Sequence, residues 1–596
     1  MYQTYLQDCQ KQSIRLHNQC RKISFWRMIT AAAAAAFFSF GYAKSFSFCY
    51  LLCAAAVLCF LFLVKVTNQK KDRLSDLSDF ESVIHDYEAR LDDGWKQFSI
   101  DGSQMHAYAM PHASDLDLLG KHSLFQYICT ASTVFGQEQL ARLLTQPDLD
   151  VAFIPSRQQA VKELTQKTDF TLHFEASARN LRTVSYDESK KNLDDFFHAL
   201  EQESNTSLLK SLTIDIVPFL TLAFFFCYLC GIQQDFTFSC FMVCAMLQLF
   251  AAFLANRHIS RLLAPVYKMN QTLTPYRKLI DLLTQESFDS PYLQQLQQSL
   301  SQKENAASAF KELASIADAV VLRHNVYAWL LLNSLFCYDF HCIKRYRKWQ
   351  TAYRHTLRIW LEVIGTVEAF ISLGVVARTR QTYTLPQILD IGKPVLSACA
   401  LKHPLLKEQA AVDNDFDLTH QTCIITGSNM SGKTTFMRTI GVNLALAYAG
   451  GFCAASDFCA SYMKICTSMR TSDSVNEGIS SFYAELLRMQ NIMETSRKQQ
   501  PMIAFIDEIY KGTNSKDRIL AARETVRNLA KPYILTILTT HDLELCDLEH
   551  DSDIDAVNYY FTERYSQNEI LFDYKIKKGR CSTTNAYYLL HMAGIL

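Results

Sequence analysis

The chain has 596 residues, too many for one hydrophobic core, so we expect several domains. Lys and Arg together number 59, and so do Asp and Glu. This balance excludes a protein whose whole surface is adapted to nucleic acid, and a DNA-binding face would have to be a local patch. The 19 cysteines are scattered, and several lie in apolar runs where cysteine packs as a small hydrophobic residue. Reduced thiols in the cytosol are expected rather than a disulfide scaffold.

Two apolar runs, 23–42 and 46–64, follow a polar and basic N-terminus of about 22 residues. Each run is close to the ~20 residues that a helix needs to cross ~30 Å of hydrocarbon. Basic residues flank the outer ends, with Lys22 before the pair and Lys65 after it. This pattern predicts a transmembrane hairpin with both ends in the cytoplasm. A cleaved signal peptide is the alternative, and two consecutive runs argue against it.

A second pair of apolar runs, 212–232 and 236–254, has basic residues such as Arg257 outside it and none in its connector. It predicts a second hairpin with the same orientation, and therefore four spans in all. Asp215 and Pro218 interrupt the first of these runs, and helices buried in a soluble core are the alternative.

The rest of the first 400 residues is predicted to be helical and soluble. The run 326–338 is too short for a span and carries Asn333 in its middle, so a buried core helix is expected there. The basic cluster 344–348 that follows is expected on a solvated face beside the membrane surface.

Residues 422–435, TCIITGSNMSGKTT, carry the strongest motif in the chain. An apolar run that predicts a buried strand leads into a segment that fits G-x-x-x-x-G-K-[ST] at every fixed position, and an apolar helix is predicted over 436–449. In such a loop, backbone N–H groups surround phosphate oxygens, the lysine reaches the β- and γ-phosphates, and the hydroxyl after it binds Mg²⁺. The candidate nucleotide-binding residues are Gly427, Ser428, Asn429, Met430, Ser431, Gly432, Lys433, Thr434 and Thr435. A chance glycine-rich turn is the alternative, which the flanking strand and helix disfavour.

Two further predicted strands end in polar residues. The strand 502–506 is followed by Asp507, which is suited to hold Mg²⁺, and by Glu508, which could orient or deprotonate the attacking water. The strand 534–538 is followed by His541, which could sense the γ-phosphate. A capping or core histidine is the alternative for this residue, but its position after a core strand favours a functional role.

These segments resemble the ATPase domain of the MutS family. The phosphate loop with its helix, the acid pair with the loop 511–517, the histidine in TTHDLEL (539–545) and the segment GISSF (478–482) all look like that family's motifs. The resemblance covers roughly 115–200 and 260–596. It implies that ATP and Mg²⁺ are bound, that Glu508 positions water with Lys433 and His541 at the phosphates, and that Thr434 and Asp507 hold the metal. It also implies that Ser480 completes the site of a partner subunit, hence a homodimer. No base contact is assigned near 412–414.

The departures from the family concern the parts that handle DNA. The apolar hairpin stands where the family has a soluble mismatch-reading domain, and the second hairpin stands where the helical lever carries a DNA-gripping clamp. The expected fold is a multi-domain one: an α-helical lever and core with transmembrane hairpins, followed by a C-terminal α/β P-loop domain. The expected domains are an N-terminal segment (1–22), a hairpin (23–66), the helical core (67–211), a second hairpin (212–256), the lever and core (257–400) and the ATPase domain (401–596).

The first functional hypothesis is a membrane-anchored MutS-like ATPase in the cytoplasmic membrane of a bacterium. Its ATPase domain and both termini would be cytoplasmic, and its homodimer would carry nucleotide-driven motion into the bilayer. The alternative is a membrane-tethered DNA-binding repair or recombination factor, which the neutral charge disfavours. A transporter is a third reading, weakened by spans that hold almost no charged residues.

Overall fold

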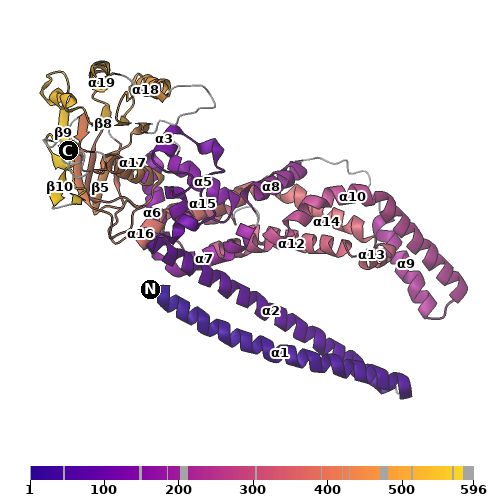
Figure 1. Cartoon of the computed structure of the whole chain (residues 1–596). Helices are drawn as coiled ribbons and strands as arrows, with labels where there is room; N and C mark the ends of the chain where they lie inside the picture. The colour runs from indigo at the N-terminus through magenta and orange to yellow at the C-terminus, as the bar shows by residue number, and fades with distance from the viewer. Residues whose placement is uncertain are drawn as a thin grey trace.

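The computed structural model describes residues 2–44, 47–145, 151–183, 185–201, 213–301, 305–390, 392–418, 421–428, 430–469, 481–511, 514–566 and 569–581. They form a C-terminal α/β domain, a helical core and two long helical arms (Figure 1). The predicted division into a helical region and a C-terminal α/β domain is confirmed.

A six-stranded sheet organises the α/β domain, with strand order β12-β9-β4-β8-β7-β6. All neighbouring strands in it are parallel except β12, which is antiparallel to β9. The strands are β4 (Thr422–Thr426), β6 (Lys464–Ser468), β7 (Met502–Asp507), β8 (Ile534–Thr540), β9 (Ala556–Tyr560) and β12 (Lys577–Lys578). The three strands predicted from the sequence are β4, β7 and β8.

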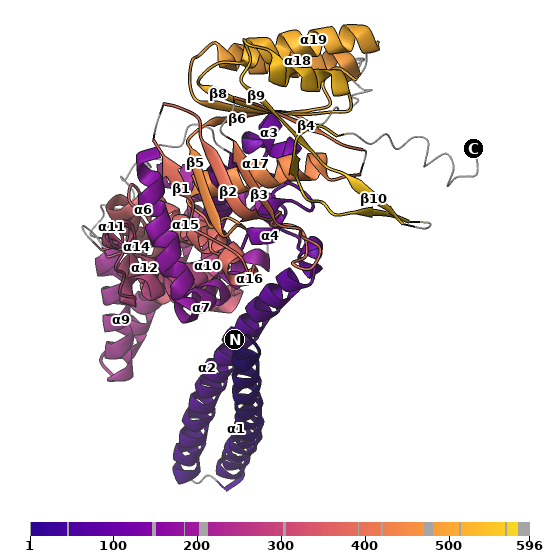
Figure 2. The same cartoon turned by 90° about the vertical axis from the view of Figure 1, so that its left-hand side faces the viewer.

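Helices cover both faces of this sheet (Figure 2). Helix α17 (Lys433–Ala449) lies on one face, and α18 (Ser481–Ser496) and α19 (Ser515–Leu529) lie on the other. Alternate residues of β7 point to opposite faces, so Ile503 and Phe505 pack in the core shared with α17, while Ala504 packs in the core with α19. Burial on both faces explains why these strands read as continuous apolar runs.

A second sheet packs beneath α17, with strand order β1-β5-β2-β3. Its strands are β1 (Gln387–Leu389), β2 (Leu396–Leu401), β3 (Asn414–Leu418) and β5 (Asp457–Ser461). A separate hairpin of β10 (Glu563–Ser566) and β11 (Glu569–Phe572) follows β9.

The helical core surrounds α15 (Leu357–Leu373), whose apolar side chains are almost all buried. Around it lie the short helices of residues 111–201 and the later helices of the lever, which share one hydrophobic core with α17. Their bounds are α3 (Pro111–Asp115), α4 (Leu124–Ile128), α5 (Val134–Thr145), α6 (Ile154–Gln166), α7 (Thr168–Ala178), α8 (Tyr186–Glu201), α11 (Pro291–Ser299), α12 (Ala306–Arg323), α14 (Tyr338–Tyr353) and α16 (Val375–Thr379).

The first arm is a pair of helices, α1 (Tyr2–Lys44) and α2 (Ser47–Leu91), packed against each other. At 1.5 Å per residue α1 is about 64 Å long, more than twice the thickness of the hydrocarbon layer. At its base Tyr2 stacks on Tyr87 of α2, and the Tyr5 hydroxyl donates to the Asp169 carboxylate in the core helix α7. Most of the arm's exposed large hydrophobic side chains lie between Phe25 and Phe62. The two predicted spans are therefore the distal part of longer helices, and the predicted N-terminal segment 1–22 continues helix α1 toward the core.

The second arm is the helical lever, whose end carries α9 (Thr213–Leu229), the first half of α10 (Gln234–Gln285) and α13 (Val326–Phe336). Helix α10 has 52 residues, about 78 Å, and runs without interruption from the apolar end into the core. Both views place the two arms on the same side of the molecule, pointing away from the α/β domain (Figures 1 and 2).

Four helices among the described residues are long and apolar enough to cross a membrane: Tyr2–Ala43, Phe48–Leu91, Gln234–Met269 and Leu357–Thr379. In the first three, at most 17% of the most apolar window is buried, whereas 83% is buried in the fourth, which is the core helix α15 continued by α16. The predicted span 212–232 is the shorter apolar helix α9.

The expectation of a buried core helix over 326–338 is wrong. Among the side chains of α13, Tyr327 is 85% exposed and Leu331 is 60% exposed, and the buried one is Asn333. The physical reason is that the helix lies at the end of the lever, where α10 is its main neighbour and α9, α12 and α14 add smaller contacts.

Candidate active site

Three parallel strands bring the predicted catalytic residues to one edge of the six-stranded sheet. In the register of β4 and β8, Thr426 lies opposite Thr540, and in that of β7 and β8, Asp507 lies opposite Thr539. The phosphate loop leaves β4, the acid pair leaves β7 and His541 follows β8, so all three meet at the carboxyl ends of the strands. This is the edge at which open α/β sheets bind ligands.

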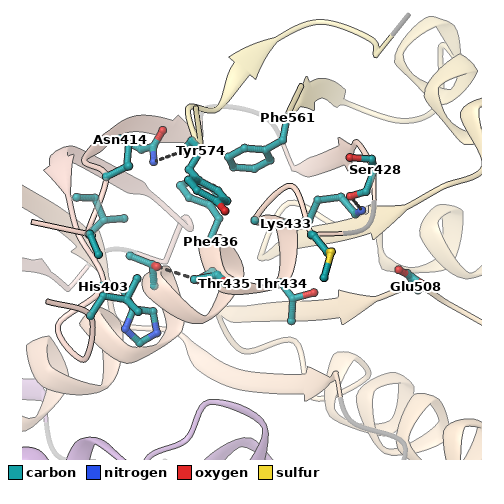
Figure 3. Close-up of a pocket in the computed structure, with 17 residues that line it drawn as sticks. His403, Asn414, Ser428, Lys433, Thr434, Thr435, Phe436, Glu508, Phe561 and Tyr574 are labelled. Carbon is teal, nitrogen blue, oxygen red and sulfur yellow. Dashed lines mark hydrogen bonds between the residues drawn. The ribbon is translucent and has the colours of Figure 1, made fainter. Parts of the chain in front are cut away.

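The loop between β4 and α17 has the conformation of a phosphate cradle (Figure 3). Gly427 and Gly432 adopt φ angles of +149° and +104°, which favour glycine. A Cβ atom on Gly427 would lie 2.8 Å from the carbonyl oxygen of Phe561. Inside the loop, the Lys433 ammonium donates to the carbonyl oxygens of Gly427 and Ser428 at 2.8 and 2.9 Å. Burial lowers the pKa of Lys433, and the nearby carboxylates of Glu508 and Asp507 oppose this shift.

Thr434 and Asp507 provide the oxygen ligands that Mg²⁺ prefers. The Thr434 hydroxyl donates to Oδ2 of Asp507 at 2.9 Å, and Thr539 donates to the other carboxylate oxygen. Among the described residues no cluster of three or more His, Cys, Asp or Glu could hold a metal. One hydroxyl and one carboxylate fit Mg²⁺, which commonly keeps several waters and binds through one or two carboxylates together with substrate phosphates.

Glu508 lies between two basic side chains at the same edge. Its carboxylate is 2.9 Å from Nε2 of His541 and 3.0 Å from Nζ of Lys511. The hydrogen bond from His541 is the largest cause that lowers the pKa of Glu508 to about 2. An acid this strong is a weak proton acceptor, so this geometry favours positioning of water over its deprotonation. The residue also has φ +51°, a conformation that non-glycine residues adopt at a cost and that is frequent at functional sites.

A cavity of about 480 Å³ extends from the phosphate loop toward the second sheet. Aromatic side chains line its middle, and Figure 3 shows Tyr574 beside Phe436 and Phe561. Asn414 fixes this arrangement: its amide donates to the carbonyl oxygen of Tyr574 at 3.1 Å and accepts from the N–H of Ile576 at 2.8 Å. A cavity of this size with apolar walls and a polar end suits a nucleotide.

Comparisons with known proteins agree with this geometry. A family model described as MutS domain V matches residues 423–595. The DNA mismatch repair protein MutS of Aquifex pyrophilus is 31% identical over 201 residues, which are 33% of this chain and 23% of the relative. Its counterparts in Protochlamydia amoebophila and Acetivibrio thermocellus are 29% and 28% identical over 39% of this chain, and the matches cover 28% and 27% of those proteins. The C-terminal α/β domain of this chain belongs to the MutS family.

The match is confined to a part of each protein, because it spans about a quarter of the length of these MutS relatives. Domain V of MutS is a P-loop-like ATPase domain, and in this chain it corresponds to the α/β domain that carries the cavity. What the complete relatives do is therefore not transferred to this chain by the match alone.

Most of the site residues predicted from the sequence lie together in this MutS domain. Ser428, Met430, Gly432, Lys433, Thr434, Thr435 and Glu508 line the cavity. Ser431 is buried beneath the loop, where its hydroxyl donates to the carbonyl oxygen of Ser428 at 2.8 Å. His541 lies 3.4 Å from the Lys433 ammonium. Asn429 and Ser480 lie outside the described residues.

Sequence reasoning missed the far end of the cavity. His403, Asn414, Phe436, Phe561 and Tyr574 line it. Burial lowers the pKa of His403 to about 4, helped by Arg438 and Arg380, so its imidazole is neutral at pH 7. Tyr574 at this end covers the phosphate loop, because a Cβ on Gly432 would lie 3.1 Å from the Tyr574 ring.

Proposed function

We propose that this chain is a membrane-anchored ATPase that hydrolyses ATP in a composite site of a homodimer and transmits the resulting motion to its two arms. The observation that carries the proposal is the convergence of Lys433, Thr434, Asp507, Glu508 and His541 at one sheet edge beside a nucleotide-sized cavity. This set supplies each group that phosphoryl transfer to water requires.

The roles follow from the contacts. Lys433 would exchange its bonds to two loop carbonyls for phosphate oxygens, which are stronger partners for an ammonium. Thr434 and Asp507 would hold Mg²⁺, which would neutralise charge on the phosphates. Glu508 would orient the attacking water, and His541, whose Nε2 lies 2.9 Å from the Glu508 carboxylate and 3.4 Å from the Lys433 ammonium, would respond to the γ-phosphate. The family resemblance of Ser480 supports completion of each site by a second copy.

Helix α18 supports the proposed coupling, because it contacts the catalytic loop and the helical core at once. Glu485 accepts a hydrogen bond from the N–H of Tyr510, two residues after Glu508. One turn further along the same face, Nη1 of Arg488 lies 3.0 Å from both carboxylate oxygens of Asp115, which is in α3. A change at Glu508 can therefore reach the short helix that follows the first arm.

Membrane insertion is supported by the two arms. Their distal parts expose many large apolar side chains, while basic residues such as Lys65 and Arg257 follow the apolar segments toward the core. In water such surfaces would be far larger than soluble monomers expose. Insertion of the distal ends of both arms into one bilayer accounts for their exposed apolar side chains. The α/β domain would then lie on the cytoplasmic side.

A second candidate function is DNA binding in repair, favoured because the matched relatives are DNA mismatch repair proteins. The matched residues are those of the ATPase domain, however, and the net charge of the chain is zero. Binding to DNA phosphates would release counterions and would weaken steeply as salt is raised.

The decisive experiment measures ATP turnover by the full chain in lipid vesicles, with and without heteroduplex DNA, beside Glu508→Ala. Turnover that Glu508→Ala abolishes and DNA leaves unchanged is the expected result. Turnover that rises with mismatched over matched duplex would refute the membrane machine in favour of the repair factor. Loss of the protein from the vesicles on washing with alkaline carbonate would refute membrane insertion.

A further inference from the structure

Helix α13 at the end of the lever exposes an apolar surface that the proposed spans do not explain. The segment 326–338 contains no charged residue. Its exposed large hydrophobic side chains are Val326, Tyr327, Leu330, Leu331 and Phe336. The helix has 11 residues, about 16 Å, which is half of what a span requires.

Two contacts place α13 beside the apolar part of α10. Just before it, Nη2 of Arg323 donates to the carbonyl oxygen of Asn256 at 3.3 Å. Just after it, Sγ of Cys337 donates to Oε1 of Gln248 at 3.3 Å. The two contact points on α10 are eight residues apart, or about 12 Å. Helix α13 therefore covers the half of the apolar segment of α10 nearest its basic flank.

The chain then turns sharply, since α13 and α14 meet at 84°. The polar groups of this corner face one another: Oδ2 of Asp339 accepts from Nε of Arg323 at 2.9 Å and from Nε1 of Trp329 at 3.0 Å. The N–H of Asp339 donates to Oδ1 of Asn333 at 3.0 Å. Asp339 is completely buried, and the Arg323 side chain is 7% exposed. Apart from Oδ1 of Asp339, which is buried without a hydrogen-bond partner, the polar groups named here bond to one another and leave an apolar outer surface that hydrocarbon tolerates.

We propose that α13 is embedded in the cytoplasmic leaflet of the bilayer without crossing it, with its outer face on lipid acyl chains. The inference rests on the proposed membrane insertion of α9 and α10. Lipid is the occupant because the apolar face of α13 is continuous with those of α9 and α10. At the exit of the segment, Lys344 of α14 pairs with Asp215 at the start of α9 at 2.8 Å, and both side chains are about half exposed, as expected at a headgroup layer.

The test places the photoreactive residue benzoylphenylalanine at single positions of the full chain, in vesicles of phosphatidylcholine and phosphatidylglycerol. The test positions are Tyr327 and Leu331. Phe253 on α10 is the positive control for lipid contact. Leu520 on α19 is the negative control, because it is 63% exposed but lies in the α/β domain. Adducts are identified by mass after irradiation, and ATP turnover verifies that each variant is folded.

We expect lipid adducts at Tyr327 and Leu331 in yields comparable to that at Phe253, and only background at Leu520. Adducts at Phe253 with background at Tyr327 and Leu331 would overturn the proposal for α13 and leave the membrane anchor intact. Crosslinks from Tyr327 or Leu331 to a second chain in place of lipid would also overturn it. Background at all four positions would refute both the proposal and membrane insertion of this arm.

Discussion

The contact between Asp115 and Arg488 offers a direct test of how the two parts of the molecule are joined. Asp115 lies in the helical core and has no exposed surface, and its carboxylate also accepts the N–H of Met469 at 3.2 Å. Arg488 reaches it from α18 with a side chain that is 25% exposed. Asp115→Asn keeps the shape but removes the charge, and Arg488→Gln removes the opposite partner.

The expected magnitude follows from these contacts. A hydrogen bond to a charged group contributes about 1.5–3 kcal/mol, and the partial exposure of Arg488 places this pair near the lower half of that range, at about 2 kcal/mol. In a unit of about 200 residues, each kcal/mol shifts the unfolding midpoint by about 2–4 °C. Asp115→Asn is therefore expected to lower the apparent midpoint by about 4–8 °C.

The assay is thermal unfolding of the detergent-solubilised chain for the two single variants and their combination. If the residues act as one pair, the double variant loses less stability than the sum of the single losses, with a coupling energy of about 1–2 kcal/mol. The matched control is the pair Arg580–Asp547 at 2.9 Å, whose side chains are 49% and 54% exposed. Surface pairs of this kind contribute about 0–1 kcal/mol. If the stability losses of Asp115→Asn and Arg488→Gln are simply additive in the double variant, the two side chains do not act as a pair that holds α18 to the helical core.

Four further changes test the site. Glu508→Gln should lower ATP turnover by about 10²-fold, because the attacking water would be misplaced, while a fluorescent nucleotide still binds; unchanged turnover would remove Glu508 from the reaction. The hydrogen bond from His541 is the largest cause that lowers the pKa of Glu508 to about 2, so Glu508 stays ionised down to that pH. In His541→Ala the pKa of Glu508 should rise toward the ordinary glutamate value. The pH at which residual ATP turnover falls on the acid side should therefore be higher. Tyr574→Ala should weaken ATP binding about tenfold, measured by titration, because an aromatic–base stack is worth about 1–3 kcal/mol. Gly432→Ala should impair ATP binding through its φ of +104°, whereas Gly392→Ala, which meets no atom within 4 Å, should not.

The sequence was sufficient to predict the chemical half of the site. Each of β4, β7 and β8 is a buried apolar run that ends in polar residues, and parallel strands present their carboxyl ends at one edge. Proximity of the phosphate loop, Asp507 and His541 thus follows from local patterns and one topological rule. The far end of the cavity does not, because Asn414 and Tyr574 meet across 160 residues and their pairing depends on how β12 returns beside β9.

The error at 326–338 has a specific cause. A polar side chain in mid-helix needs a partner, so Asn333 indicates a protein interior when only the sequence is considered. Its partner is local: it receives the N–H of Asp339 across the turn between α13 and α14. Composition alone cannot separate a helix that faces protein from one that faces lipid, because both are apolar. For α15 and α13 the difference lies in burial, which only the packed structure reveals.

The two arms are connected to the α/β domain in different ways, so the proposed nucleotide-dependent motion would reach them by different routes. The first arm enters the core through α2, whose last turn is held by Arg90, which donates to the carbonyl oxygens of Tyr127 and Cys129 at 2.8 and 2.9 Å. It is followed within about 25 residues by Asp115, the partner of α18. The lever arm packs into the core around α15, and α10 extends about 78 Å as one helix. Under the proposed function, a small rotation of the core would be amplified at the end of the lever, whereas the first arm would respond to α18 through Asp115 of α3. Relative movement of two apolar ends within one bilayer is the mechanical output that this arrangement favours.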